Sequence, residues 1–293
     1  AAHRLLADHP ADVVVAFHPV PVQTLSHVLI RTEPSLPLVA VGTDLVVMHA
    51  FWAAPGVRRY LVATEAARAR LIRHGVAPAR IEVVGLPVRH RFHEVADVER
   101  RVVRERLGLE DPERPLVLAM AGGVGFGPLE RVARALAAAE LPAQLAVVTG
   151  HNRRLRERLQ PLVRPGRVWV EGFVENVHEW MRAADLLVTK AGPATLAEAL
   201  AVGVPLVLWG AIPAQETPNV RLIVEAGAGV WAPGPRRTVR AVAHLLGNPL
   251  ARARMEARAR RLARPGAADR IARALIGGAP IPQGASSCPS TRR

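Results

Sequence analysis

The sequence predicts an α/β protein made of two doubly wound parallel-sheet domains, the first of them incomplete in this chain. Short β-branched runs alternate with Ala-, Arg- and Leu-rich helical stretches along most of its length. Glycine-containing turns follow several runs, and a break at residues 85–92 begins where Gly85 and Pro87 end an expected strand. This alternation is typical of parallel strands whose connecting helices cover both faces of a sheet.

The apolar runs are expected to form the strands. Leu116-Val-Leu-Ala-Met120, for example, has no polar alternation, which suits a strand buried on both faces. Helical patterns lie between most of the runs. The expected strands are residues 12–17, 38–41, 60–63, 81–84, 116–120, 145–149, 168–170, 186–189 and 205–208.

We place a domain boundary near residue 90, because the break ends one series of strands and a charged helix over 97–107 precedes the next. The domains are then residues 1–90, the carboxy-terminal part of a first domain, and residues 91–276. Residues 277–293, rich in Gly, Pro and Ser, are expected to be a disordered tail. Since Ala1 falls inside a helical pattern, we interpret the chain as a fragment or one whose start is missing.

Composition limits the functional classes. Half of the 293 residues are hydrophobic, and no run of 18 apolar residues predicts a transmembrane helix. A single cysteine, Cys288, excludes an internal disulfide and favours a reducing cytoplasm. The net charge is +14, Lys190 is the only lysine, and there is one tyrosine. Scarce stacking residues argue against nucleic acid, so we expect an anionic membrane surface as partner. A genomic bias toward arginine is the alternative explanation.

A glycine loop follows the expected strand 116–120. Gly122, Gly123 and Gly125 allow a tight turn and a close approach of backbone to a ligand, and a helix is expected from Leu129. Free N–H groups and the positive dipole end of that helix suit a diphosphate. The spacing is not that of the dinucleotide fingerprint, and a turn without ligand is the alternative.

A second such turn is Lys190-Ala-Gly-Pro-Ala-Thr195. Gly192 gives backbone freedom before a helix that begins with Pro193, and Thr195 lies in its first turn. Glu198 follows at i+3 from Thr195, so both side chains can face one cleft. Lys190 adds a point charge for phosphate. The alternatives are an ordinary surface lysine and a solvated helix glutamate.

A third polar loop, which includes Gln215 and Glu216, follows the expected strand 205–208. Both side chains are acceptors for sugar hydroxyls. Alone this loop is unremarkable in composition. Three polar loops at the carboxyl edge of one sheet predict a ligand site there.

The segment before the break supplies candidates for the opposite side of the site. Asp44 follows the expected strand 38–41, where its carboxylate can act as a general base. His18 is a second candidate, although a lone histidine is more often structural. Phe51 and Trp52 are expected in a core or interface, yet an apolar rim suits a lipid acceptor.

Taken in order, these motifs resemble the monogalactosyldiacylglycerol synthase family. Its members are glycosyltransferases with two Rossmann-like domains, the GT-B fold, and are related to the peptidoglycan N-acetylglucosaminyltransferase. The resemblance runs from about residue 12 to about residue 275. The matching motifs are Gly42-Thr-Asp-Leu, His49-Ala-Phe-Trp, Gly85-Leu-Pro-Val, Gly122-Gly-Val-Gly-Phe-Gly-Pro, Glu171-Gly-Phe, Thr189-Lys-Ala-Gly-Pro-Ala-Thr-Leu-Ala-Glu and Ile212-Pro-Ala-Gln-Glu.

The resemblance implies transfer of a hexose from a UDP-sugar to diacylglycerol with inversion, by a peripheral enzyme on the cytoplasmic face of a membrane. Residues 1–90 would face the acceptor, with Asp44 and His18 as catalytic residues, and residues 91–276 would bind the donor. The glycine loop and Gly192–Thr195 would line the diphosphate, Phe173 and Val174 the uracil, Glu198 the ribose, and Gln215 and Glu216 the sugar. No Asp-X-Asp motif is present, so neither metal nor cofactor is expected.

Two departures accompany the resemblance. A glycine-rich, histidine-containing acceptor loop of the family has no match here, so the isolated chain is expected to bind donor yet to lack part of the acceptor site. Ala194 and Ala214 stand where the family often has Gly, which is tolerable if φ is negative. The alternatives are another lipid-linked acceptor such as a peptidoglycan precursor, a UDP-sugar 2-epimerase, and a catalytically silent nucleotide-sugar-binding module.

Overall fold

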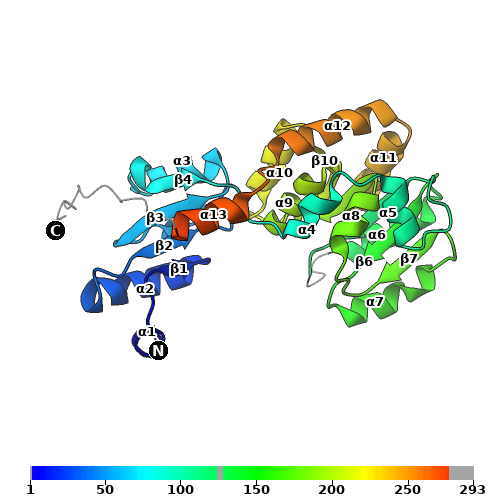
Figure 1. Cartoon of the computed structure of the whole chain (residues 1–293). Helices are drawn as coiled ribbons and strands as arrows, with labels where there is room; N and C mark the ends of the chain where they lie inside the picture. Colours follow the sequence, from blue (N-terminus) through cyan, green and yellow to red (C-terminus); the bar gives the residue numbers. More distant parts are fainter. Residues whose placement is uncertain (1, 124–127, 277–293) are drawn as a thin grey trace.

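The computed structural model describes residues 2–123 and 128–276, and this part contains two parallel β-sheets flanked by helices (Figure 1). The α/β class predicted from the sequence is confirmed. The predictions for Gly125 and for the tail at residues 277–293 lie outside the described residues.

The first sheet has four strands in the order β1-β2-β3-β4, all parallel. Each connection leads to the next strand in the same direction across the sheet. Because such connections are right-handed, the helices between the strands lie on the same face of the sheet. Val22, Trp52 and Leu71 from these helices are buried in one cluster. The elements are α1 (Ala2–Asp8), β1 (Val14–Ala16), α2 (Pro19–Thr32), β2 (Leu38–Val41), η1 (Ala50–Trp52), β3 (Val57–Val62), α3 (Glu65–Arg73), η2 (Pro78–Arg80) and β4 (Ile81–Val83).

The second sheet has six parallel strands in the order β10-β9-β8-β5-β6-β7. The order reverses between β5 and β8, as in a doubly wound dinucleotide-binding fold. Its elements are α4 (His90–Val95), α5 (Arg100–Arg106), β5 (Leu116–Met120), α6 (Leu129–Ala138), β6 (Gln144–Val148), α7 (Arg153–Leu159), η3 (Gln160–Leu162), β7 (Val168–Glu171), α8 (Val177–Ala183), β8 (Leu186–Lys190), α9 (Pro193–Val202), β9 (Leu206–Gly210), α10 (Thr217–Glu225), β10 (Gly229–Trp231), α11 (Pro235–Leu246) and α12 (Pro249–Leu262).

The central strand β5 shows why an unbroken apolar run lies in the middle of this sheet. Successive side chains of a strand point to opposite faces. Leu116 and Leu118 belong to the cluster formed with α4, α5, α8, α9 and α10, and Val117 and Ala119 to the cluster formed with α6, α7 and α11. Both faces of β5 are therefore buried.

A buried ion pair aligns β5 with β8. The Arg104 guanidinium of α5 donates to Asp185 at 2.6 Å, and the same carboxylate accepts the backbone N–H of Leu116 at 2.8 Å. Their side chains are 6% and 15% exposed. The two strands that frame the reversal point thus share one anchor at their amino-terminal ends.

The last described helix, α13 (Ala267–Ile276), packs on the first sheet and not on the second (Figure 1). Ile271 is buried with Val39 and Leu61 on the face that α2 and α3 leave open. The Arg270 guanidinium donates to the carbonyl of Val84 at 2.7 and 3.0 Å. The chain therefore covers the second face of its first sheet with its own far end. The domain boundary near residue 90 stays a prediction.

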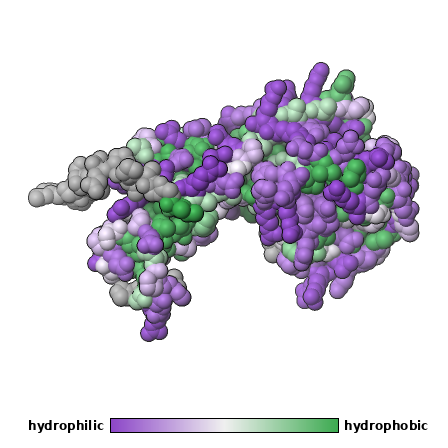
Figure 2. All heavy atoms as spheres, viewed as in Figure 1, coloured by the Kyte–Doolittle hydropathy of each residue, from purple (hydrophilic) through white to green (hydrophobic). Residues whose placement is uncertain are grey.

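The strands observed agree with those predicted to within a few residues at each end. One strand, β10, was missed. On the face shown in Figure 2 the larger half is mainly hydrophilic, and a hydrophobic area lies on the smaller half. No helix of the described ranges is long and apolar enough to cross a lipid bilayer.

Candidate functional site

The point where the strand order reverses brings two predicted loops together. Gly122 follows β5 with φ +72°, and a Cβ atom built on it would lie 3.9 Å from Thr195 Oγ1. The glycine loop thus faces the first turn of α9. No side chain caps α9, whose N-cap is Gly192, so its first N–H groups are left for a ligand or water. Gly123, the residue after Gly122, is exposed to solvent.

Lys190 and Glu216 form an ion pair under the turn between β8 and α9. The Lys190 Nζ donates to Glu216 Oε1, and the backbone N–H of Ile212 donates to Oε2 at 2.9 Å. The side chains of Lys190 and Glu216 are 18% and 4% exposed. A Cβ on Gly192 would lie 3.1 Å from Nζ, so a larger residue there would press on the pair.

The loop after β9 presents Gln215 and not Glu216 to solvent. Gln215 is exposed, whereas Glu216 is buried by its contacts with Lys190 and Ile212. Asn219 donates from Nδ2 to the carbonyl of Ala191 at 3.0 Å, which ties α10 to the turn after β8. Of the two residues predicted to bind the sugar, Gln215 is therefore the one whose side chain is accessible to a ligand.

Glu198 lies one turn into α9, and its side chain is half-buried. Burial raises the pKa of its carboxyl to about 7, and only the exposed Arg89 before α4 opposes the shift. Within the described residues it has no hydrogen-bond or ion-pair partner. It is therefore a half-buried acceptor without a protein donor, as a binder of hydroxyl groups should be.

The loop after β6 reaches the same place. The backbone N–H of His151 donates to the carbonyl of Gly123 at 2.8 Å. Its ring stacks on Phe173, with centroids 4.1 Å apart and an angle of 12°. Phe173 is 54% exposed, while Val174 next to it is half-buried against the core.

Asp44 lies at the carboxyl edge of the first sheet between two histidines. The Trp52 indole donates to its Oδ2 at 3.0 Å. Burial raises the pKa of the Asp44 carboxyl above its ordinary value, although Trp52, His18 and His49 oppose that shift. A half-buried carboxylate of raised pKa is suited to accept a proton.

His18 and His49 both serve as helix caps. Nδ1 of His18 accepts the backbone N–H of Val20 at 3.3 Å, and Nδ1 of His49 accepts that of Phe51 at 3.1 Å. In the neutral rings Nε2 therefore carries the proton. The capping role accounts for both residues structurally, so the catalytic role of His18 stays a prediction.

Three exposed apolar side chains surround this edge. Phe17, Val20 and Phe51 are 50%, 54% and 53% exposed. Gln23 of α2 donates to the carbonyl of Phe51 at 3.1 Å, which joins α2 to η1. Trp52, by contrast, is fully buried, as expected for a core residue. The Asp44 carboxylate thus has an apolar neighbourhood open to solvent.

Two family models match the chain. The model of monogalactosyldiacylglycerol (MGDG) synthase matches residues 1–88, and that of the glycosyltransferase family 28 C-terminal domain matches residues 116–271. The Arabidopsis thaliana protein "Monogalactosyldiacylglycerol synthase 1, chloroplastic" is 36% identical over 282 residues, which are 91% of this chain and 51% of that protein. The chain belongs to the monogalactosyldiacylglycerol synthase family. It spans about half the length of the curated relatives it matches.

Solved structures show that this family member has the GT-B fold. The crystal structure of Acinetobacter baumannii MurG matches with a TM-score of 0.69 at 19% identity, over 95% of this chain and 76% of that one. The UDP-GlcNAc 2-epimerase from Neisseria meningitidis bound to UDP-GlcNAc matches with a TM-score of 0.69 at 13% identity, over 94% and 78%. At such low identity these likenesses establish the fold alone.

Sequence reasoning missed two residues of the candidate site, Arg89 and His151, whereas His49 stands in one of the motifs that carry the resemblance. His151 had a usable signal, since Thr149-Gly150-His151-Asn152 follows an expected strand as the other loops do. Arg89 lies in a connection far from Glu198 along the chain, so only the packing of α4 on α9 brings them together.

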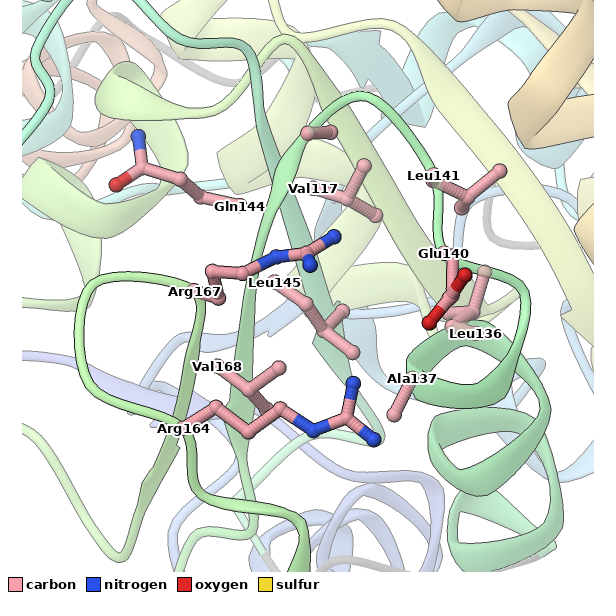
Figure 3. Close-up of a pocket in the computed structure, with 11 residues that line it drawn as sticks. Val117, Leu136, Ala137, Glu140, Leu141, Gln144, Leu145, Arg164, Arg167 and Val168 are labelled. Atoms are coloured by element: carbon pink, nitrogen blue, oxygen red, sulfur yellow. The ribbon is translucent and has the colours of Figure 1, made fainter.

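A separate small cavity of about 20 Å³ lies at the other edge of the second sheet (Figure 3). It is lined by residues near the amino-terminal ends of strands, such as Val117 and Leu145, and Figure 3 shows Arg164 extending toward Ala137. It has room for about one water molecule. Because the predicted loops lie at the carboxyl ends, this cavity is not part of their site. Among residues 2–123 and 128–276 no cluster of His, Cys, Asp or Glu could hold a metal ion.

Proposed function

We propose that this chain carries the donor site and part of the acceptor site of an inverting glycosyltransferase that moves a hexose from a UDP-sugar to diacylglycerol. The observation that carries this proposal is the meeting of Gly122 with the uncapped first turn of α9 at the strand-order reversal. This arrangement offers N–H groups and a helix dipole to a diphosphate. Family membership favours diacylglycerol over a peptidoglycan precursor, and the relatives' name favours galactose.

In the proposed reaction Asp44 accepts the proton of the diacylglycerol hydroxyl. The hydroxyl oxygen attacks the anomeric carbon, and the bond from that carbon to the UDP β-phosphate oxygen breaks. The negative charge that remains on UDP is stabilised by the N–H groups at the start of α9, in place of a metal ion. Opposite-face attack in a single displacement inverts the anomeric centre.

We assign the remaining donor contacts on the same basis. Glu198 accepts hydrogen bonds from the ribose, Phe173 and Val174 contact the uracil, and Gln215 with Glu216 binds the sugar. In this assignment Lys190 acts on the donor through Glu216, since its ammonium is already paired with that carboxylate.

The test is calorimetry of this chain with UDP, followed by donor screening of the full-length protein with UDP-galactose and UDP-glucose and diacylglycerol. We expect UDP binding and a glycolipid product. Failure of UDP to bind would contradict the donor site. Binding without product from any lipid acceptor would instead support a nucleotide-sugar-binding module.

We further propose that the protein is peripheral on an anionic membrane surface at the cytoplasmic face. The charge of +14 and the exposed Phe17, Val20 and Phe51 next to Asp44 support this. Flotation with anionic vesicles should weaken as salt is raised, and the double variant Phe17→Ser/Phe51→Ser should float less than wild type. Leu250→Ser, at a side chain 71% exposed on α12, is the matched control. Flotation that does not depend on salt would contradict a role of the net charge of +14 in binding to anionic lipid.

A further inference from the structure

His151 connects two parts of the donor site that the sequence predicted separately. Its backbone N–H donates to Gly123 O at 2.8 Å in the glycine loop. Its ring covers one side of Phe173, the residue predicted to contact the uracil. One residue of the β6–α7 loop therefore touches both the diphosphate side and the base side.

Gly150, the residue before His151, packs tightly against the backbone of the glycine loop. Gly150 has φ +60°, and a Cβ on it would lie 2.3 Å from Gly123 O and 3.1 Å from Gly122 O. Only glycine fits there without moving the loop. The conformation of Gly150 thus sets the distance between His151 and Gly123.

The stacked rings of His151 and Phe173 lie at the surface and are not part of a hydrophobic core. Phe173 is 54% exposed, and His151 is exposed as well. With parallel rings at 4.1 Å, His151 holds the Phe173 ring in one orientation and leaves its opposite side open. A flat heterocycle can stack on that open side, because aromatic rings gain energy from offset stacking.

We propose that His151 is a positioning residue for the nucleotide. Its ring orients Phe173 for the uracil, and its N–H holds Gly123 for the diphosphate, so the spacing between base and diphosphate is fixed by one residue. This inference rests on the proposed function, because it assumes that UDP occupies the site.

The experiment is calorimetry of this chain with UDP and with UMP, after thermal unfolding of each variant has shown that it is folded. His151→Ala keeps the backbone N–H and removes only the ring, so we expect both nucleotides to bind about three- to tenfold more weakly. His151→Phe restores stacking and should return affinity to within about twofold of wild type. His244→Ala, an exposed histidine on α11, is the matched control and should bind as wild type does.

Gly150→Ala tests the other contact. Its Cβ displaces Gly123, so UDP affinity should fall more than UMP affinity, since UMP lacks the β-phosphate. Wild-type affinity in His151→Ala, or no recovery in His151→Phe, would overturn the inference. A chain that binds no UDP at all would instead contradict the proposed function.

Discussion

At the scale of single residues, Glu198 couples a proposed ligand-binding position to the stability of the fold. Its carboxyl has a pKa of about 7 in the folded chain against an ordinary value of 4.5, because burial disfavours the charged form. Between these values the folded state holds a proton that the unfolded state has lost. The stability that this group contributes is fully present below pH 4.5 and is lost as pH rises through 7.

We therefore predict that Glu198→Gln removes this loss, because glutamine cannot ionise. The Tm of the variant minus that of wild type should increase from about pH 5 to about pH 8, since the pKa shift acts over this window. Thermal unfolding at several pH values measures it. Glu157→Gln, at an exposed position of α7, is the control and should show a constant difference. A constant difference for Glu198→Gln as well would mean that its carboxyl is not desolvated.

Ala214 does not meet the condition of negative φ under which alanine is tolerable in place of glycine. Its φ is +64°, whereas Ala194 lies within α9. Left-handed backbone costs a residue with a Cβ roughly 1–2 kcal/mol. Ala214→Gly should therefore raise the free energy of unfolding by about 1 kcal/mol, measured by urea denaturation.

Ala194→Gly is the matched comparison at the second position that the family often fills with glycine. There glycine lowers helix propensity, so the free energy of unfolding should fall by up to about 1 kcal/mol. Opposite signs at the two positions are the expected pattern. A loss of stability in Ala214→Gly would show that the left-handed conformation is not strained.

At the scale of elements, the turn between β8 and α9 depends on the Lys190–Glu216 pair. Removing one partner of a buried ion pair leaves an uncompensated charge, which costs about 3–5 kcal/mol. With Glu216 only 4% exposed, Lys190→Met should lower the free energy of unfolding by about 3 kcal/mol. The double variant Lys190→Met/Glu216→Gln should recover most of it. Additive losses in this double-mutant cycle would refute a paired role.

Most strands could be predicted from the sequence because they are apolar runs with a glycine or proline near one end. The strand β10 could not, since Gly229-Val-Trp231 is too short to show a period. The carboxyl ends of parallel strands meet at one edge, so the positions of Gly122, Gly192 and Gln215 also followed from the pattern.

Contacts between loops could not be predicted in the same way. Lys190 and Glu216 are 26 residues apart, and their pairing depends on the side-chain geometry after β8 and β9. His151 looks like an ordinary turn residue until its ring is seen on Phe173. Sequence periodicity shows that a helix has an apolar face and does not show which surface that face covers.

At the scale of the whole molecule, α13 is the helix whose packing partner is hardest to predict from the sequence. Ile271 is 5% exposed against β2 and β3, and Ile276 on the same helix is 86% exposed. Ile271→Ala should lower the free energy of unfolding by about 2–4 kcal/mol, measured by urea denaturation. Ile276→Ala should leave it unchanged. Equal effects of the two substitutions would contradict the packing of α13 on the first sheet.

The position of α13 also has a consequence for biosynthesis. Residues 14–83 leave the ribosome long before residues 267–276 exist, yet they need Ile271 to cover Val39, Val41 and Leu61. During translation, one apolar face of the first sheet therefore stays uncovered while the second sheet and its helices are made. A chain that ends before residue 267 therefore leaves this face of the first sheet without the cover that Ile271 supplies, and an uncovered apolar sheet face favours aggregation.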